Sequence, residues 1–506
     1  MVQQADVLVV GAGPTGLVLA LWLTQQGVSV RIIDKSTGPG ETSRAMAVQA
    51  RTLELYRQLG IADEAVAAGH PNLTINLWAK GQHRARLVLG DAGADITPYP
   101  YVLVHPQDQH ERLLIRRLET LGVAVERQTE LIDFEDVGDR VQARLRMPDG
   151  SEQVCAARYL GGCDGASSTI RHRMGAGFEG GTYKQVFYVA DVRLSGLEPA
   201  DEAHIALDSA DFVVVFPYGN GLVRLIGTVQ DERADRAETL TFDDVDQQAI
   251  EGLGLKVEAL NWFSTYRVHH RVTDHFRKDR AFLLGDAAHV HSPAGGQGMN
   301  TGIADAINLA WKLAAVLKGR APDALLDSYE QERKAFAHKL VETTDRIFTF
   351  VTADSSFADF VRIRIAPLLA SVAYKMESVR ETLFRMISQT TLNYHGSMLS
   401  EGRAGSVQGG DRLPWVSAPG LDNHGSLRAI AWQVHVYGDA SPEMKAWCAR
   451  QGLALHVFPW RAEHEAVGFA RDAAYLLRPD TYVALADPSG SPGVLQSYFD
   501  SRSQSP

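Results

Sequence analysis

The stretch DVLVVGAGPTGLVLALWLTQQGVSVRIID, residues 6–34, decides the fold. Residues 6–10 form a short apolar segment typical of a strand, and a glycine-rich turn follows it. The next segment has helical apolar periodicity and ends at Gly27, a residue type common just beyond helix ends. Residues 28–34 predict a second strand. Strand, helix and strand in this order predict a βαβ unit at the start of an α/β fold.

The turn has the spacing G-x-G-x-x-G. Gly11 permits the tight turn, Gly13 lets the backbone approach a pyrophosphate, and Gly16 lets the helix lie close to the strand. Asp34 follows about 20 residues later, where a carboxylate accepts a hydrogen bond from a ribose hydroxyl. A plain tight turn is the alternative. We predict dinucleotide binding by Gly11, Gly13, Pro14, Thr15, Gly16, Asp34 and Lys35.

Length and charge restrict the class of protein. A chain of 506 residues predicts two to four domains, and its net charge of −11, with basic residues scattered, argues against nucleic acid and anionic membranes as partners. No apolar run reaches about 18 residues, the length needed to span a bilayer, and the N-terminus has no leader pattern. We expect a cytoplasmic protein. The three cysteines, Cys155, Cys163 and Cys448, have no spacing that suggests a metal site or a redox disulfide.

A second stretch with the pattern of a phosphate- or cofactor-binding βα unit lies in the middle of the chain: AFLLGDAAHVHSPAGGQGMNTGIADAINLAWKLA, residues 281–314. It predicts an apolar strand, a Gly-Asp turn, a glycine-rich loop and a long amphipathic helix. Asp286 would lie at the carboxyl edge of the sheet, where ligands of such folds bind. A helix or turn cap is the alternative for this residue.

Three segments together resemble a known family. GAGPTG, CDGASSTIR (residues 163–171) and LLGDAAHVHSPAGGQGMN resemble the three signatures of the single-component flavin aromatic hydroxylases, the para-hydroxybenzoate hydroxylase class. Their order and spacing match, and the resemblance covers nearly the whole chain. It implies bound FAD, NADPH or NADH as a transient co-substrate, and O₂. The implied reaction hydroxylates a phenolic or other electron-rich aromatic compound through a flavin C4a-hydroperoxide.

The resemblance also implies roles for residues of the third signature. Asp286, next to Gly285, would accept from a ribityl hydroxyl of FAD. Reduced flavin carries negative charge, which the N-terminal end of the helix at Gly298, Met299 and Asn300 would stabilise. Pro293 would form the wall beside the reactive edge of the flavin.

Other positions match the family more locally. Asp164 and Gly165 of the second signature would serve FAD and the nicotinamide, with a simple turn as the alternative. Arg44 matches an arginine near the pyrophosphate and the mobile flavin, and a surface arginine is the alternative. Gln107, in a Q-x-x-x-E-x-x-L pattern, would contact the FAD ribose region; Gln109 is a competing register, and a solvated helix glutamine is the alternative.

The substrate would lie between the flavin and a strand-rich middle region. DFVVVFPYGNGLVRLIG (residues 211–227) and WFSTYRVHHRV (262–272) mix aromatic and polar residues, as ligand pockets do. The candidates are Phe216, Tyr218, Arg224, His269 and His270. Because adjacent strand residues face opposite ways, at most one of the two histidines enters the pocket. Each candidate has an ordinary strand or surface role as its alternative.

The C-terminal part resembles a thioredoxin-like appendage of the phenol and aromatic-polyketide hydroxylase branch. The resemblance rests on GDRLPWVSAPG (410–420) and LLRPDTYVALAD (476–487), in which Thr481 replaces the usual Gly. With only Cys448 available, this domain cannot perform dithiol chemistry. We expect an FAD-binding domain from residues 1–72, 101–181 and 273–345, and a substrate-binding β domain from 73–100 and 182–272. A helical connector over 346–400 and a thioredoxin-like domain over 401–506 complete the expected division.

The predicted fold is therefore α/β: a Rossmann-like FAD-binding domain, a β-sheet substrate domain and a C-terminal thioredoxin-like domain. The predicted function is an FAD-dependent aromatic monooxygenase that uses NADPH or NADH, acts on a small aromatic or polycyclic substrate and carries no metal. Two alternatives stay open: Baeyer–Villiger oxygen insertion into a polyketide ketone, and a flavoprotein without catalysis. The resemblance to the family also suggests a homodimer.

Overall fold

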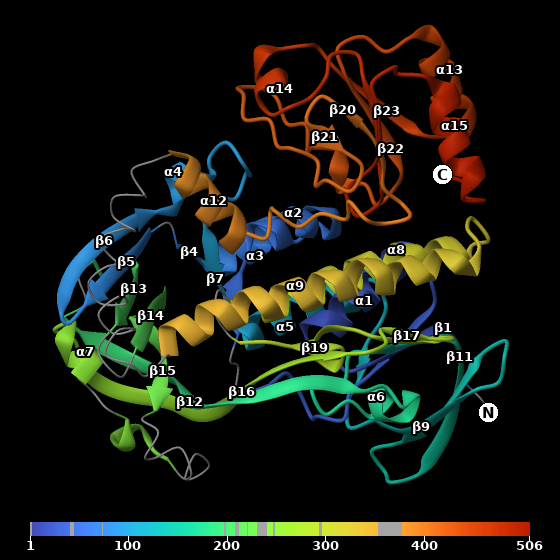
Figure 1. Cartoon of the computed structure of the whole chain (residues 1–506). Helices are drawn as coiled ribbons and strands as arrows, with labels where there is room; N and C mark the ends of the chain where they lie inside the picture. Colours follow the sequence, from blue (N-terminus) through green and yellow to red (C-terminus); the bar gives the residue numbers. More distant parts are fainter. Residues whose placement is uncertain are drawn as a thin grey trace.

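A computed structural model describes residues 3–40, 45–72, 74–196, 199–207, 212–219, 221–229, 240–245, 248–292, 296–352 and 377–506. Arg44 and Pro293, two of the expected site residues, lie outside these ranges. The chain forms three main sheets, with the C-terminal part placed over the helices of the N-terminal part (Figure 1).

The FAD-binding part is built on an eight-stranded sheet. Its main path has the order β17-β18-β11-β1-β2-β8, and β10 and β9 extend it antiparallel from β11. The strands are β1 (Gln3–Val10), β2 (Val30–Ile33), β8 (Val125–Glu126), β9 (Glu130–Asp136), β10 (Val141–Arg146), β11 (Glu152–Gly162), β17 (Arg277–Lys278) and β18 (Ala281–Leu283). Strand β1 pairs in parallel with β2 and β11, and β11 with β18. Val7 to Val10 are buried, as expected of a central parallel strand covered on both faces.

Helices α1 (Pro14–Gln25), α5 (Gln107–Thr120) and α8 (Gly298–Leu317) pack on this sheet, with α6 (Thr169–Met174) near β18. Helices α2 (Ala50–Leu59), α3 (Ala62–Ala68) and α4 (Leu89–Gly93) lie beside a small sheet of β3 (Ala47–Val48), β7 (Val102–Val104) and β4 (His70–Asn72). The short 3-10 turn η3 (Gly285–Ala287) follows β18, and a second one, η4 (Asp323–Leu326), leads into α9 (Asp327–Thr352). Helix α12 (Glu377–Ile387) follows later. The expected βαβ opening corresponds to β1, α1 and β2.

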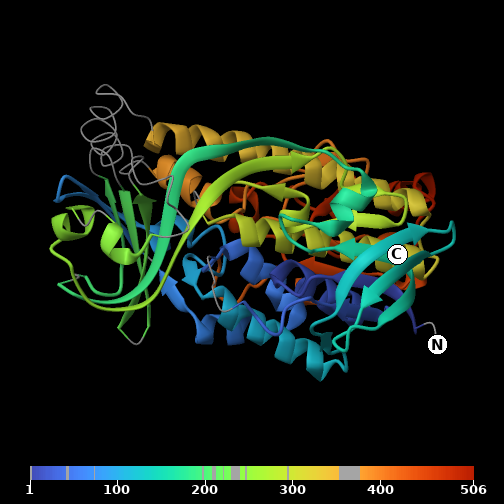
Figure 2. The same cartoon turned by 90° about the horizontal axis from the view of Figure 1, so that it is seen from below.

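The substrate part is a second eight-stranded sheet of order β19-β16-β12-β15-β14-β13-β5-β6. Its strands are β5 (Thr74–Ala79), β6 (Gln82–Val88), β12 (Phe178–Ser195), β13 (Ala203–Leu207), β14 (Phe212–Gly219), β15 (Leu222–Val229), β16 (Lys256–Thr273) and β19 (His289–Val290). The paired strands β12 and β16 arch from the FAD-binding part to the far end of this sheet (Figure 2). One face of the sheet packs under η2 (Phe242–Asp244) and α7 (Gln248–Gly252).

The C-terminal part holds a six-stranded sheet of order β21-β20-β25-β24-β22-β23. Its elements are β20 (Glu401–Ala404), β21 (Val407–Gln408), η6 (Ser426–Arg428), β22 (Gln433–Tyr437), α13 (Pro442–Gln451), β23 (Ala454–Phe458), α14 (Ala462–Ala466), β24 (Ala474–Leu477), β25 (Val483–Asp487) and α15 (Pro492–Ser501). Strand β22 is parallel to β23 and antiparallel to β24, which is antiparallel to β25. This order suits a thioredoxin-like domain, which stays a prediction.

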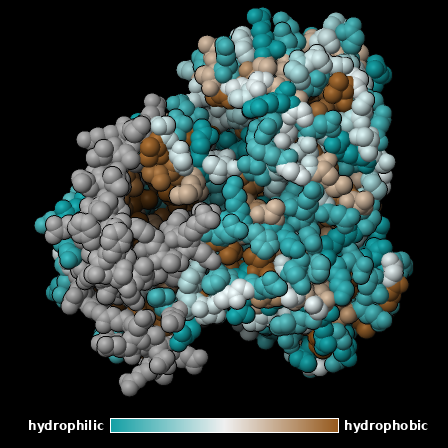
Figure 3. Space-filling view, viewed as in Figure 1, coloured by the Kyte–Doolittle hydropathy of each residue, from teal (hydrophilic) through white to brown (hydrophobic). Residues whose placement is uncertain are grey.

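The face seen in Figure 3 is mostly hydrophilic over the C-terminal part, and hydrophobic side chains line a hollow next to α4 and α12. No helix in the described ranges is long and apolar enough to cross a bilayer.

Candidate active site

The first glycine motif forms the turn between β1 and α1. Gly11 has φ +101°, in the left-handed region, and a Cβ there would overlap the carbonyl oxygen of Cys163. At Gly13 a Cβ would meet open space. No described side chain caps α1 at this residue, so the first N–H groups of the helix point outward without an intrahelical acceptor. The turn therefore offers an anion site at the carboxyl edge of the sheet.

Asp34 lies at the same edge, directly after β2. Its Oδ2 accepts from Ala12 N at 2.7 Å and its Oδ1 from Ser36 N at 2.7 Å, while Arg127 Nη1 lies 3.7 Å from Oδ1. These contacts hold the carboxylate beside the glycine turn, with its side chain 16% exposed. The position suits the predicted contact with a ribose. Lys35 is exposed next to it.

The first and third signatures, far apart in the chain, meet at Thr15. A Cβ at Gly285 would lie 2.7 Å from Thr15 Oγ1, and a Cβ at Gly302 would overlap the same oxygen. Gly302 therefore lets α8 approach α1 closely, and Gly285 lets the Gly-Asp turn do the same. This contact brings the phosphate-type turn of α1 and the Gly-Asp turn of β18 to one edge of the sheet. Asp286 is exposed there, although Gly285 and Ala287 on either side are buried.

A fully buried carboxylate, that of Asp305 on α8, holds the Gly-Asp loop from below. Its Oδ2 accepts from Gly285 N at 2.9 Å and contacts His289 Nε2 at 2.7 Å, and its Oδ1 accepts from Arg333 Nε at 2.5 Å. Burial disfavours ionisation, but Arg333 and His289 outweigh it and hold the pKa of Asp305 below its ordinary value. The two ends of the loop are thus fixed to one charged group.

Arg171 of the second signature holds the same loop from its other side. Its Nη1 donates to Ala287 O at 2.9 Å and its Nη2 to Ala166 O at 2.7 Å, and its guanidinium lies 3.9 Å above the Phe178 ring. Asp164 accepts from Ser168 Oγ at 2.6 Å and from Ile170 N at 3.2 Å, so its carboxylate orders the start of α6.

The cofactor role predicted for Asp164 stays a prediction. Gly165 beside it has φ +79° and open space at its Cβ position.

Helix α8 begins at Gly298, and no described side chain caps it. The Asn300 side chain is fully buried: its Nδ2 donates to Ala47 O at 2.8 Å and Gly296 O at 3.0 Å, and its Oδ1 accepts from Gln49 N at 3.0 Å. The Asn300 amide therefore ties α8 to β3 and α2. Only its backbone N–H, with those of Gly298 and Met299, remains for the predicted contact with the flavin.

His291 lies beside this helix end. Its Nδ1 donates to Ser292 O at 2.8 Å, while its Nε2 is buried without a partner among the described residues and lies 3.7 Å from a Cβ placed at Gly298. Burial, with the neighbouring His289, lowers the pKa of His291 to about 4. The imidazole is therefore neutral at physiological pH.

Gln107 begins α5, and its Nε2 donates to Glu111 Oε1 at 2.8 Å. Glu111 Oε2 in turn accepts from Gly40 N at 3.2 Å. The Q-x-x-x-E pattern thus links α5 to the chain segment that follows Asp34. Gln107 and Gln109 both lie in the first turn of α5, and the contact of Gln107 with FAD stays a prediction.

The candidate substrate surface is the face of the second sheet opposite α7. Phe216 pairs with Arg224, Arg224 with Asp191, and Asp191 with Trp262 across four strands. Directly paired residues share a face, so these four side chains form one cross-strand row. Ile75 shares this face through the register of β5, β13 and β14, and it packs against the core of the FAD-binding part. The row therefore faces the FAD-binding part.

Arg224 is 2% exposed and forms two 2.7 Å hydrogen bonds to the Asp191 carboxylate. Its guanidinium lies 5.8 Å from the Tyr218 ring centroid and 5.7 Å from that of Trp262. Burial, with the Asp191 charge, raises the pKa of Tyr218 to about 12, so this phenol stays protonated. The row combines aromatic surface with a neutralised ion pair.

The two histidine candidates are adjacent in β16, so their side chains lie on opposite faces of the sheet. His269 is exposed and contacts Thr182 Oγ1 at 2.7 Å through Nδ1. His270 is half-buried against the Tyr183 ring, with a centroid distance of 4.6 Å. Its position in β16 has the same parity as Trp262, so the two side chains share a face of the sheet; a substrate contact of His270 stays a prediction.

Asp305, Arg171 and Asp191 are functional candidates that sequence reasoning missed. A signal existed for the first: ADAINLAWKLA places Asp305, Asn308 and Lys312 on an otherwise apolar helix, where polar residues at this spacing indicate a buried network. Asp191 can be recognised as a candidate only from the register of the paired strands, which the sequence alone does not reveal.

Known proteins agree with this geometry. The model of an FAD binding domain family matches residues 4–344. The chain is 34% identical to 6-methylpretetramide 4-monooxygenase of Streptomyces rimosus, over 96% of this chain and 91% of that protein. Among solved structures, OxyS anhydrotetracycline hydroxylase from Streptomyces rimosus has a TM-score of 0.78 and 27% identity, covering 99% of each chain. PyrE3, a Diels-Alderase in the biosynthetic pathway of pyrroindomycins, has a TM-score of 0.77 and 28% identity, covering 99% of this chain and 100% of that chain.

The chain belongs to the FAD-dependent aromatic monooxygenases. The open space at Gly13, the uncapped starts of α1 and α8 and the exposed Asp286 fit an extended dinucleotide such as FAD. The resemblance seen in the three signatures is thereby confirmed, as are the α/β fold and the FAD cofactor.

Proposed function

We propose that this monooxygenase hydroxylates a polycyclic, electron-rich aromatic compound bound between FAD and the row of Phe216, Arg224, Asp191 and Trp262. The single observation that carries the proposal is this row. It presents two aromatic side chains and a neutralised ion pair toward the FAD-binding part. Flat aromatic surface favours stacking with fused rings, and the ion pair supplies hydrogen-bonding groups without net charge.

The names of two relatives support a polycyclic substrate. They act on 6-methylpretetramide and anhydrotetracycline, and tetracyclines are fused polycyclic compounds. NADPH or NADH would be the reductant, and O₂ the oxygen source. When bound, FAD supplies the redox and oxygen-transfer chemistry; the protein binds, orients and excludes water.

The proposed cofactor contacts follow the geometry of the sheet edge. Asp34 and the turn at Gly11–Gly16 would hold the ADP end, and Asp286 the ribityl chain. The first N–H groups of α8 would lie near the ring, where they favour negative charge. Asp164, Gln107, Arg44 and Pro293 keep the roles that the resemblance implies.

The test is a spectral-shift screen of phenols and fused aromatics against the FAD-loaded protein, followed by NAD(P)H and O₂ consumption with each binder. Fused aromatics should bind and stimulate both, with one oxygen added. Product NMR separates ring hydroxylation from Baeyer–Villiger insertion, since both add one oxygen. A preference for single-ring phenols would refute the polycyclic substrate. Asp286→Ala should weaken FAD binding; unchanged affinity would overturn its assignment.

A second candidate is a flavoprotein that does not oxygenate its ligand, which the likeness to the Diels-Alderase PyrE3 favours. Anaerobic mixing with NADPH or NADH in the presence of each binder separates the two. A monooxygenase bleaches its flavin absorbance, whereas the second candidate does not.

We also propose the domain division stated above, a thioredoxin-like C-terminal domain, a homodimer and a cytoplasmic location. Light scattering coupled to size exclusion would measure the oligomeric state.

A further inference from the structure

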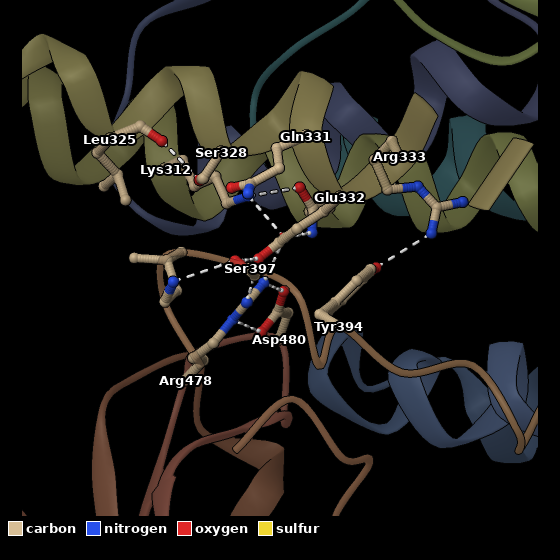
Figure 4. Close-up of polar contacts among 12 residues, drawn as sticks. Lys312, Leu325, Ser328, Gln331, Glu332, Arg333, Tyr394, Ser397, Arg478 and Asp480 are labelled. Atoms are coloured by element: carbon tan, nitrogen blue, oxygen red, sulfur yellow. Dashed lines mark hydrogen bonds and ion pairs between the residues drawn. The ribbon is translucent and has the colours of Figure 1, made fainter. Parts of the chain in front are cut away.

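The C-terminal domain contacts the FAD-binding part at several points, among them Arg412 with Glu54 and Asp422 with Arg57. The most extensive polar contact is made by the turn from Arg478 to Thr481, between β24 and β25. Arg478 donates to Glu332 of α9, from Nη1 to Oε1 at 2.6 Å and from Nη2 to Oε2 at 3.0 Å. It also donates to Asp480 of its own turn, from Nε to Oδ1 at 2.9 Å and from Nη2 to Oδ2 at 2.6 Å. Figure 4 shows Arg478 and Asp480 pointing from the C-terminal domain toward Glu332 on the long helix.

Helix α8 completes this cluster. Lys312 Nζ donates to Glu332 Oε2 at 2.8 Å, and Trp311 Nε1 donates to Asp480 Oδ2 at 3.0 Å. The side chains of Lys312, Glu332, Arg478 and Asp480 are at most 2% exposed. Two cations and two anions thus balance in a region without solvent. Such a cluster contributes little net stability compared with apolar packing, but it demands one relative placement of its parts.

The same turn also holds α2. Arg51 Nη2 donates to Asp480 O at 3.1 Å and to Thr481 Oγ1 at 2.7 Å. Thr481 has φ +70°, a conformation that strains a β-branched residue. Its hydroxyl provides the contact with Arg51 that Gly would lack.

Helices α2 and α8 are also joined at the flavin end, by Asn300. Its Oδ1 accepts from Gln49 N and from Thr52 Oγ1 at 2.8 Å, and its Nδ2 holds Gly296 O in the loop before α8. Thr52 directly follows Arg51 on α2. The two helices are therefore fixed twice, once by the C-terminal turn and once beside the predicted flavin ring.

We propose that Arg478 and Asp480 are positioning residues of the monooxygenase. By fixing α8 against α2, the C-terminal turn holds the start of α8 and the Gly296 loop in the arrangement that FAD requires. The C-terminal domain is then a working part of the flavin site, without redox chemistry of its own. The inference rests on the proposed function only where its test measures product formation.

The test is a double substitution that leaves the net charge of the cluster unchanged. Arg478→Met with Asp480→Asn removes one cation and one anion and leaves Lys312 paired with Glu332. The matched control is Arg471→Gln, which removes an exposed arginine of the same domain whose ion pair with Asp472 is 3.8 Å long. A milder variant, Trp311→Phe, removes the indole N–H bond to Asp480 and part of the buried ring, and leaves both charges of the turn in place.

Three quantities are measured below the melting temperature of each variant: FAD affinity, the visible circular dichroism of bound flavin, and product formed per NAD(P)H oxidised. We expect the double variant to bind FAD about two- to thirtyfold more weakly, with an altered flavin dichroism and a lower product yield per NAD(P)H. Trp311→Phe should change all three in the same direction by less, and Arg471→Gln should match the parent.

A folded double variant with parental FAD affinity and flavin dichroism would overturn the proposal. If the double variant does not fold, Trp311→Phe decides by the same criteria. If the parent binds FAD but oxidises no aromatic compound, the proposed function fails while the FAD and dichroism measurements still decide this inference.

Discussion

Asp305→Ala is the most informative single substitution, because Asp305 joins the Gly-Asp loop to a buried arginine. The change removes the acceptor for Gly285 N and His289. Among the described residues, the fully buried Arg333 keeps Tyr394 Oη and Thr301 O as hydrogen-bond partners but loses its carboxylate. Removing one partner of a buried ion pair costs about 3–5 kcal/mol. With an unfolding entropy of ~2.1 cal/mol/K per residue, a chain of 506 residues that unfolds as a unit loses about 3–5 °C in Tm.

The affinity of Asp305→Ala for FAD should fall together with its melting temperature. An unsatisfied Gly285 N–H costs ~1–3 kcal/mol, and because Asp286 follows Gly285 directly, a displaced loop weakens FAD about 5- to 150-fold. Asp305→Asn separates the two effects, since its oxygen can still accept from Gly285 and His289 while the charge opposite Arg333 is lost.

The assays are thermal unfolding at fixed FAD concentration and titration of the apoprotein with FAD by flavin fluorescence. Asp305→Asn should lower Tm but retain FAD affinity within about threefold. The control Asp133→Asn, at an exposed pair with Arg144, should change stability by less than about 1 kcal/mol. Parental FAD affinity in Asp305→Ala would refute the reasoning.

Three further predictions concern the turn at Gly11, the C-terminal turn and the buried lysine. Gly11→Ala should abolish FAD binding, because its Cβ would overlap the Cys163 carbonyl; a normal flavin spectrum would contradict this. Thr481→Ala should lower Tm more than Thr481→Gly, since both lose the Arg51 bond but only Gly relieves the positive φ. Burial lowers the pKa of Lys312 to about 8, so the unfolded chain binds more protons between pH 8 and about 10.5, and stability should rise with pH there. Urea unfolding at a series of pH values should show the free energy of unfolding of the parent rising by up to ~3 kcal/mol relative to that of Lys312→Met across this window. A difference that does not change with pH would contradict the prediction.

The sequence by itself determined the local parts of this protein. The βαβ opening and the three signatures are encoded within short windows, because backbone conformation depends on glycines, apolar periodicity and caps of neighbouring residues. The class of enzyme followed from the resemblance of those signatures, in their order, to a known family.

Only the tertiary structure decided which distant side chains meet. Asp305 holds Gly285 from 20 positions away, Arg478 meets Glu332 across 146, and the row from Phe216 to Trp262 depends on the register of four strands. Asn300, which local pattern assigned to the flavin, uses its side chain to join α8 to α2. Partners of a buried polar group are chosen by the packing of whole elements, since any arrangement that leaves such a group unsatisfied is costly. No local spacing carries that information.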